Sequence, residues 1–115
     1  MRHDDALLYD MLFFARRVSE GIAGVDFDRF TSDYYFQQGI IRLIGNIGEA
    51  ASKVTRELQD VHPEIAWAKI IGMRHRIVHG YFDINLATVW ESAVNDVPAL
   101  ISALEPLVPW KDNPP

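Results

Sequence analysis

Residues 40–58 read IIRLIGNIGEAASKVTREL and decide the fold of this chain. Apolar residues recur along the stretch at intervals of three or four, which is the spacing of one face of an α-helix. They are Ile40, Ile41, Ile44, Ile47, Ala51, Val54 and Leu58. The chain has no proline before Pro63. The stretch therefore predicts a long amphipathic helix that is capped by Thr31 or Ser32 and ends near residue 59.

Two further lines of residues run along this expected helix. A polar stripe begins at Arg42 and continues at offsets of 4, 7, 11 and 14 residues from it. It is either a solvated face or a surface that binds an RNA backbone. Its members are Arg42, Asn46, Glu49, Lys53 and Arg56. A line of small residues comprises Gly45, Gly48 and Ser52. Each glycine inside a helix costs about 0.5–1 kcal/mol relative to alanine, so the pair predicts that another backbone lies close. That backbone belongs either to a second copy of the chain or to another helix of the same copy.

The remaining pattern is also helical. We expect a first helix from residue 4 or 5 to about residue 20, and a connector over residues 22–30. A third helix should run from Pro63 to residue 78 or 79, because proline suits a first turn and Gly80 suits the exit. Asn85 should cap a fourth helix that Pro98 kinks or splits. With residues 106–115 as a loosely ordered tail, the prediction is a single all-α domain over residues 1–115, an antiparallel bundle of four or five helices.

Composition limits the function. The 115 residues suit one domain, and 49% of them are hydrophobic, which is enough for a packed core. A net charge of −5 argues against broad electrostatic binding of nucleic acid, although a small basic cleft remains compatible with it. The absence of cysteine excludes disulfides and thiolate metal sites and fits a reducing cytoplasm. No long apolar run or signal-peptide pattern is present, so we expect no membrane association.

The segment 73–81, MRHRIVHGY, carries the candidate chemistry. Arg74 supplies a permanent cation for a phosphate, and His79 can exchange a proton near neutral pH. These groups provide what cleavage of RNA without a metal requires, and DNA would be spared because it lacks the 2′-hydroxyl. Positions 74 and 79 lie about 140° apart around a regular helix. They share a site only if the helix ends between them or if a second subunit completes it.

At these residues the chain resembles a known family. Arg74, His79 and Tyr81 match the Arg-x4-His-x-Tyr signature of HepT-type toxins with the HEPN fold. The likeness extends to other segments of that family in the same order, namely residues 47–51, 62–67, Trp90 and 96–98. The resemblance covers roughly residues 30 to 105.

The resemblance implies a homodimeric, metal-independent endoribonuclease that needs no cofactor and acts on RNA, with tRNA among the family's targets. Arg74 and His79 would be catalytic, and His75, Glu49 and Asn46 would support them. The implied partner is a minimal nucleotidyltransferase antitoxin that transfers AMP to Tyr81. The family commonly has asparagine where this chain has His75, which leaves the assignment of acid and base open.

Other interpretations stay open from the residues alone. Arg74 can form a structural salt bridge with Glu49, and His79 can cap a helix C-terminus. His75 and His79 have the spacing of two zinc ligands, although only Asp83 is near as a third. As an alternative function, the chain is a non-catalytic HEPN module that dimerises, binds a nucleotide and docks a nucleotidyltransferase.

Overall fold

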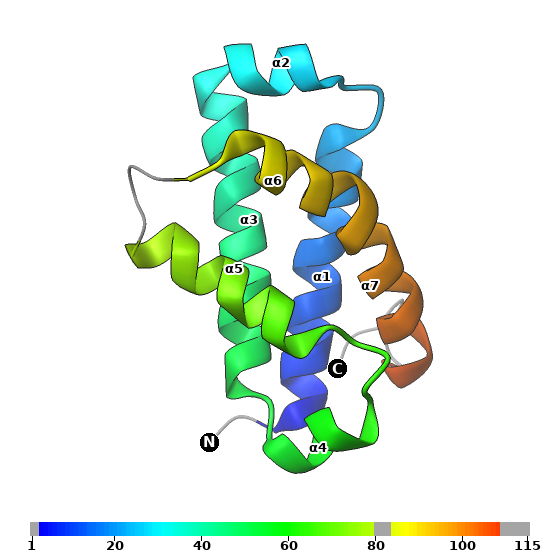
Figure 1. Cartoon of the computed structure of the whole chain (residues 1–115). Coiled ribbons are helices and arrows are strands. Elements are labelled where there is room, and N and C mark those ends of the chain that lie inside the picture. The colour runs from blue at the N-terminus through cyan, green and yellow to red at the C-terminus, as the bar shows by residue number, and fades with distance from the viewer. Residues whose placement is uncertain (1–2, 80–83, 109–115) are drawn as a thin grey trace.

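The computed structural model describes residues 3–79 and 84–108, and for residues 78 and 79 it describes the backbone alone. Its main helices are α1 (Asp4–Ile22), α3 (Tyr34–Lys53) and α5 (Trp67–His79). They are followed by α6 (Leu86–Glu91), a π-helical segment (Ser92–Asp96) and α7 (Val97–Leu104). The described residues contain no strand, so the predicted all-α class is confirmed. Helices α1 and α3 run antiparallel, and α5 crosses α3 (Figure 1).

The core lies around α1, which packs against α3 on one side and α7 on another. The predicted apolar faces supply it, and Met11, Ala15 and Val18 of α1 are fully buried. Ile40, Ile44 and Ile47 of α3 face them and are at most 4% exposed. Burial of one such aliphatic side chain contributes about 1.5–3 kcal/mol, so this interface is the main support of the bundle.

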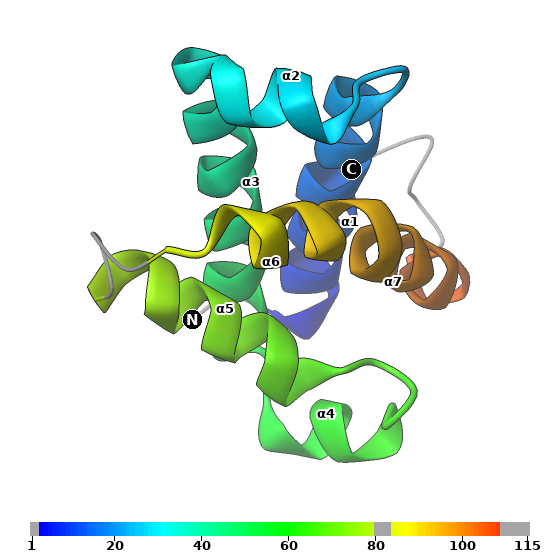
Figure 2. The same ribbon diagram turned by 45° about the horizontal axis from the view of Figure 1, so that its top comes forward.

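The expected connector over residues 22–30 is partly helical, which corrects the prediction. Helix α2 (Phe27–Ser32) is capped by the Asp26 side chain, which accepts a hydrogen bond from the Arg29 amide at 2.8 Å. Phe30 anchors this short helix because its ring is fully buried and lies 5.1 Å from the ring of Trp90. Helix α2 therefore covers one end of the α1–α3 pair, and α4 (Arg56–Val61) covers the other (Figure 2).

The long helix is shorter than predicted at both ends. Asp33, rather than Thr31 or Ser32, caps α3 by accepting a hydrogen bond from the Phe36 amide at 3.1 Å. Helix α3 ends at Lys53, and Thr55 caps a separate helix, α4 (Arg56–Val61). The Asp4 carboxylate of α1 accepts hydrogen bonds from the Thr55 amide at 2.9 Å and from the Thr55 hydroxyl at 2.5 Å. This contact between distant segments holds the chain in an extended turn, so Arg56 leaves the predicted polar stripe.

Replacing Asp4 with alanine is expected to lower the free energy of unfolding by about 1–2 kcal/mol, because two hydrogen bonds to a carboxylate are lost. Asp5 is the matched control, since it also lies in the first turn of α1 but accepts no such bond from Thr55. Asp5→Ala should cost only the few tenths of a kcal/mol due to the helix dipole. Urea unfolding of both variants measures the difference, and equal losses would contradict the role of the Thr55 contact.

The third helix also begins later than predicted. Residues 62–66 form a turn, and α5 starts at Trp67 rather than at Pro63. The indole of Trp67 donates a hydrogen bond to the His62 carbonyl at 2.9 Å, and Ile65 is buried beneath the turn. Because both groups hold the turn against the bundle, the chain does not form a first helical turn at Pro63.

The last helix is divided near Pro98, as predicted. Asn85 caps α6 by accepting from the Thr88 amide at 3.1 Å, and the π-helical segment precedes α7. Pro98 stands in the first turn of α7, directly after the π-helical segment. The expected loose tail is wrong in its first part. Residues 105–107 form a short 3-10 helix and Val108 is fully buried, whereas residues 109–115 lie outside the described range.

No helix in the described part of the chain combines the length and the apolarity needed to cross a membrane.

Candidate active site

The close crossing of α3 and α5 builds the candidate site. A Cβ atom placed on Gly48 would overlap the Cβ of Arg74 and would lie 2.8 Å from the Ile70 carbonyl oxygen. A Cβ atom placed on Gly45 would lie 3.9 Å from its nearest neighbour, Ile77 Cγ2, which is an ordinary van der Waals contact. The predicted close approach at the glycine line is therefore an internal crossing with α5, and Gly48 is where it is tightest.

This crossing places Arg74 beside Glu49. The guanidinium of Arg74 lies 2.5 Å from the Glu49 carboxylate, and the two side chains are 33% and 41% exposed. Lys53 approaches the other oxygen of the same carboxylate at 3.4 Å. The salt bridge that the sequence offered as an alternative for Arg74 is thus present. Because the pair is open to solvent on one side, it can still orient the guanidinium toward a ligand.

Asn46 lies one turn before Glu49 on the same side of α3. Its side chain is partly exposed, and no hydrogen bond joins it to a side chain in the described part of α5. Asn46 is therefore close to Glu49 along α3.

His75 points to a different side of α5. It is exposed and lines a broad groove together with Trp67, Ile71 and Gly72 of α5 and with residues of α4. The structure therefore does not bring His75 to the Arg74–Glu49 pair within one copy of the chain. No group of three or more histidine, aspartate or glutamate side chains within residues 3–77 and 84–108 is placed to hold a metal ion.

The other two predicted site residues fall at the end of the described helix. His79 is the last residue of α5, and its side chain is outside the description. Tyr81 lies outside the described residues altogether. Helix α5 nevertheless runs unbroken from Trp67 to His79, so the helix does not end between Arg74 and His79.

Comparison with known families and proteins identifies the chain. The family model described as Ribonuclease HepT-like matches residues 11–107, which include all of α3 and α5. The chain belongs to the HepT-like ribonuclease family. No solved structure matches it.

Curated relatives agree with the HepT-like family assignment. The protein named Probable ribonuclease HepT from Thermococcus cleftensis is 30% identical over 78% of this chain and 82% of its own length. Putative RNase MJ0125 from Methanocaldococcus jannaschii is 28% identical over 90% of this chain and 89% of its own length. Putative RNase TTE0752 from Caldanaerobacter subterraneus subsp. tengcongensis is 31% identical over 70% of this chain and 72% of its own length.

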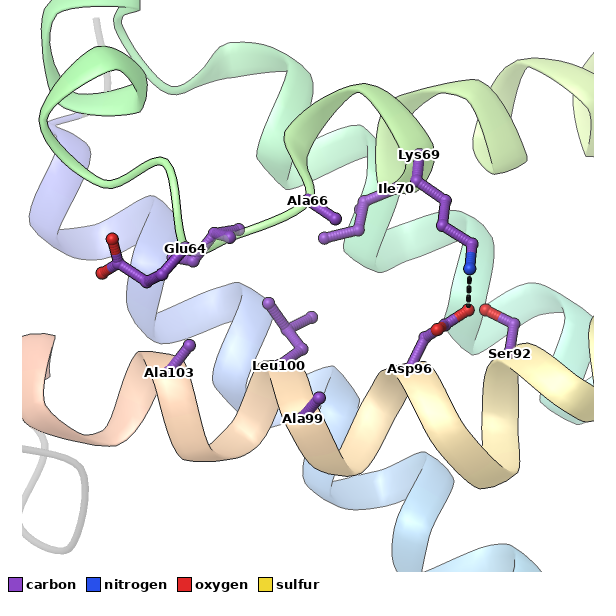
Figure 3. A pocket seen from close by; sticks show the side chains of 10 residues that line it. Glu64, Ala66, Lys69, Ile70, Ser92, Asp96, Ala99, Leu100 and Ala103 are labelled. Carbon is purple, nitrogen blue, oxygen red and sulfur yellow. Dashed lines mark ion pairs between the residues drawn. The ribbon is translucent and has the colours of Figure 1, made fainter.

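This HepT-like chain has a second concavity that the sequence did not predict. It is a pocket of about 110 Å³ between α7 and the start of α5, and it shares no lining residue with the Arg74–Glu49 pair. Figure 3 shows Lys69 reaching across it to Asp96, at 2.9 Å, with Ser92 beside the carboxylate. Small apolar residues, Ala99 and Ala103, line it on α7.

The Lys69–Asp96 ion pair joins the two helical segments on either side of this pocket. The hydrogen bond to Asp96 and its negative charge raise the pKa of Lys69 above the ordinary value of 10.5. Because the pKa of Lys69 is higher in the folded than in the unfolded chain, the pair stabilises the fold fully at pH values below the unfolded pKa. This contribution is lost as the pH rises through the folded pKa. Lys69 therefore stays charged near neutral pH and ties α5 to the π-helical segment.

Proposed function

We propose that this HepT-like chain is a metal-independent endoribonuclease that acts as the toxin of a toxin–antitoxin pair. The observation that carries the proposal is the solvent-open Arg74–Glu49 pair at the α3–α5 crossing. Its arginine begins the Arg-x4-His-x-Tyr signature, and the relatives of the chain are named as ribonucleases.

The proposed reaction is attack of a ribose 2′-hydroxyl on the adjacent phosphorus. A base removes the 2′-proton as the 2′-oxygen bonds to phosphorus, and an acid protonates the 5′-oxygen as its bond to phosphorus breaks. The products are a 2′,3′-cyclic phosphate and a free 5′-hydroxyl. Arg74 stabilises the charge that develops on the phosphoryl oxygens, and His79 serves as acid or base. His75 remains a second candidate for proton transfer.

The geometry of α5 supports a site shared by two copies of the chain. Because the helix continues to His79, positions 74 and 79 lie about 140° apart around one axis. A two-fold axis next to the crossing would supply the missing group from the partner, with each residue used twice. We therefore include homodimerisation in the proposal.

Cleavage of single-stranded RNA in excess EDTA tests the activity. The purified protein should cut the RNA and leave 2′,3′-cyclic phosphate ends, while the DNA oligonucleotide of the same sequence should stay intact because it has no 2′-hydroxyl. Cleavage that appears only when a divalent metal is added would contradict the metal-independent mechanism.

Tyr81 is the proposed site of neutralisation by a nucleotidyltransferase antitoxin. Its hydroxyl would attack the α-phosphorus of ATP, forming a tyrosyl–AMP ester and releasing pyrophosphate. The added phosphate carries negative charge and bulk, so it should repel and obstruct the RNA backbone. Intact mass spectrometry after incubation with the cognate enzyme, ATP and Mg²⁺ should show addition of AMP and loss of RNA cleavage. Labelling that persists in Tyr81→Phe would show that Tyr81 is not the acceptor.

One observation favours a second candidate function, a non-catalytic HEPN module that docks the nucleotidyltransferase. Glu49 already neutralises Arg74, on a chain with a net charge of −5. A phosphate must therefore compete with a carboxylate for the guanidinium. Stable binding of the partner without cleavage of any RNA in a panel that includes tRNA would support the module over the enzyme.

A further inference from the structure

An outward face of α3 leads from its first turn to the Arg74–Glu49 pair. Five residues at offsets of 4, 7, 11 and 14 make up this face, which we name the outer strip of α3. They are Tyr35, Gly39, Arg42, Asn46 and Glu49. All five are exposed or partly exposed, whereas the opposite face of the helix is buried in the core. The outer strip is therefore a continuous solvent-facing path along the helix.

Tyr35 is an unusual member of this surface. Its side chain is 86% exposed, which is the highest value among the large apolar side chains described. Gly39 lies one turn further on, and no heavy atom lies within 4 Å of the position where its Cβ would stand. The ring of Tyr34 packs against that of Tyr35 in a T-shaped arrangement with 5.6 Å between centroids, and the open position at Gly39 leaves room for a nucleobase to stack beside Tyr35.

The distal half of the strip carries a local surplus of positive charge. Arg42 is exposed, and Arg74 and Lys53 both contact Glu49, so three cations and one carboxylate lie on or beside this half of the strip. At a rise of about 1.5 Å per residue, Arg42 lies roughly 10 Å from Glu49 along the axis and Tyr35 roughly 21 Å. On an acidic chain, this is a place where a polyanion meets attraction rather than repulsion.

We propose that the outer strip of α3 binds the single-stranded RNA substrate, with one base stacked on Tyr35 and one phosphate bound by Arg42. The strip then directs the strand toward Arg74. This inference rests on the proposed ribonuclease function, because it extends that site along α3. The ring of Tyr35, the open position at Gly39 and the cation of Arg42 follow one another along the helix, and this order suits a single strand of alternating bases and phosphates. A protein partner would instead need a wider apolar area, and Tyr35 is the only large apolar side chain on the strip.

Binding of a non-cleavable RNA tests the proposal separately from catalysis. The probe is a fluorescent single strand of about ten nucleotides in which every 2′-hydroxyl is methylated, so that the nucleophile is blocked. Tyr35→Leu keeps an apolar side chain but removes the ring, and it should weaken binding about tenfold or more. Tyr35→Phe keeps the ring and should bind like the wild type. Both changes are on an exposed residue and should leave the fold intact.

Arg42 is tested by the dependence of binding on salt. For single strands, the plot of log K against log salt has a negative slope, and the magnitude of that slope decreases by about 0.7 for each phosphate contact that is lost. Arg42→Gln should show that decrease, whereas Tyr35→Leu should weaken binding with an unchanged slope. Arg56→Gln is the matched control, because Arg56 is an exposed arginine of α4 that is off the strip and within 3.8 Å of Asp60. Its slope should equal that of the wild type.

The outcomes separate this proposal from the enzymatic one. If the wild type cuts unmodified RNA but Tyr35→Leu and Arg42→Gln bind and cut equally well, the strip proposal is wrong and the ribonuclease stands. If no RNA is cut but binding depends on Tyr35 and Arg42 as described, the strip stands and the ribonuclease does not. Dissociation of a dimer by Tyr35→Leu in sedimentation, with unchanged RNA affinity per folded chain, would instead make Tyr35 a protein contact and overturn the proposal.

Discussion

Replacing Arg74 with alanine is expected to reduce RNA cleavage at least 10²–10³-fold, about the effect of removing one group that stabilises charge in a transition state. Arg74→Lys should recover only part of the rate, because lysine keeps the charge but lacks the planar fork that binds two phosphoryl oxygens. His79→Ala should cause a loss of 10²–10⁴-fold through the missing proton transfer. Initial rates on a single-stranded RNA in EDTA measure all three variants.

Arg76 provides the control for these variants. It is an exposed arginine of the same helix, two residues from Arg74, and it has no part in the proposed site. Arg76→Ala should cleave RNA within a few-fold of the wild type. Circular dichroism should show equal helix content in every variant, because the Arg74–Glu49 pair is solvent-open and such pairs contribute at most about 1 kcal/mol. Wild-type rates in Arg74→Ala or His79→Ala would remove the catalytic assignment.

Replacing Gly48 with alanine is expected to lower the free energy of unfolding by about 2–3 kcal/mol. In most helices this change stabilises by up to about 1 kcal/mol, since glycine is the weaker helix former. Here the new methyl group would overlap the Cβ of Arg74 and approach a backbone carbonyl of α5, so the two helices must separate. The same separation displaces Arg74, and the cleavage rate should therefore fall together with the stability.

Gly39→Ala is the matched control for Gly48→Ala, because it lies in the same helix and a Cβ there meets no atom within 4 Å. It should raise the stability by up to about 1 kcal/mol. Urea unfolding midpoints of the two variants should therefore move in opposite directions. A stabilising effect of Gly48→Ala would show that α5 does not pack on α3 as described.

The limits of the sequence are clearest where distant segments meet. The apolar spacing predicts α3 and its buried face, but it also predicts that the helix continues past Thr55. The helix ends earlier because Thr55 donates hydrogen bonds to Asp4, and no local sequence pattern indicates a contact between such distant segments. Asp26 and Asp33 are ordinary capping residues, but Thr31 and Ser32 offer a competing cap beside Asp33, and the helix after Asp26 has only 6 residues. The late start of α5 likewise depends on the bond from the Trp67 indole to the His62 carbonyl.

For the candidate site, the sequence supplied the chemistry and the structure supplied part of the geometry. The pairing of Arg74 with Glu49 and the close approach at Gly48 were both predicted as possibilities, and both are present. The place of His75 on another face than Arg74 agrees with the turn of about 100° between successive residues of a regular helix, whereas the Lys69–Asp96 pair joins two helical segments and does not follow from spacing along one of them. The roles of His79 and Tyr81 stay predictions.

The sequence by itself determined the helical class, the buried faces and the family signature, since these depend on periodicity and on local order along the chain. Tertiary structure alone decided that the glycine line of α3 meets α5, that Glu49 holds Arg74, and that the outer strip of α3 stays in solvent. The physical reason is that a helical period specifies which residues share a face, whereas only packing between distant segments specifies what that face contacts.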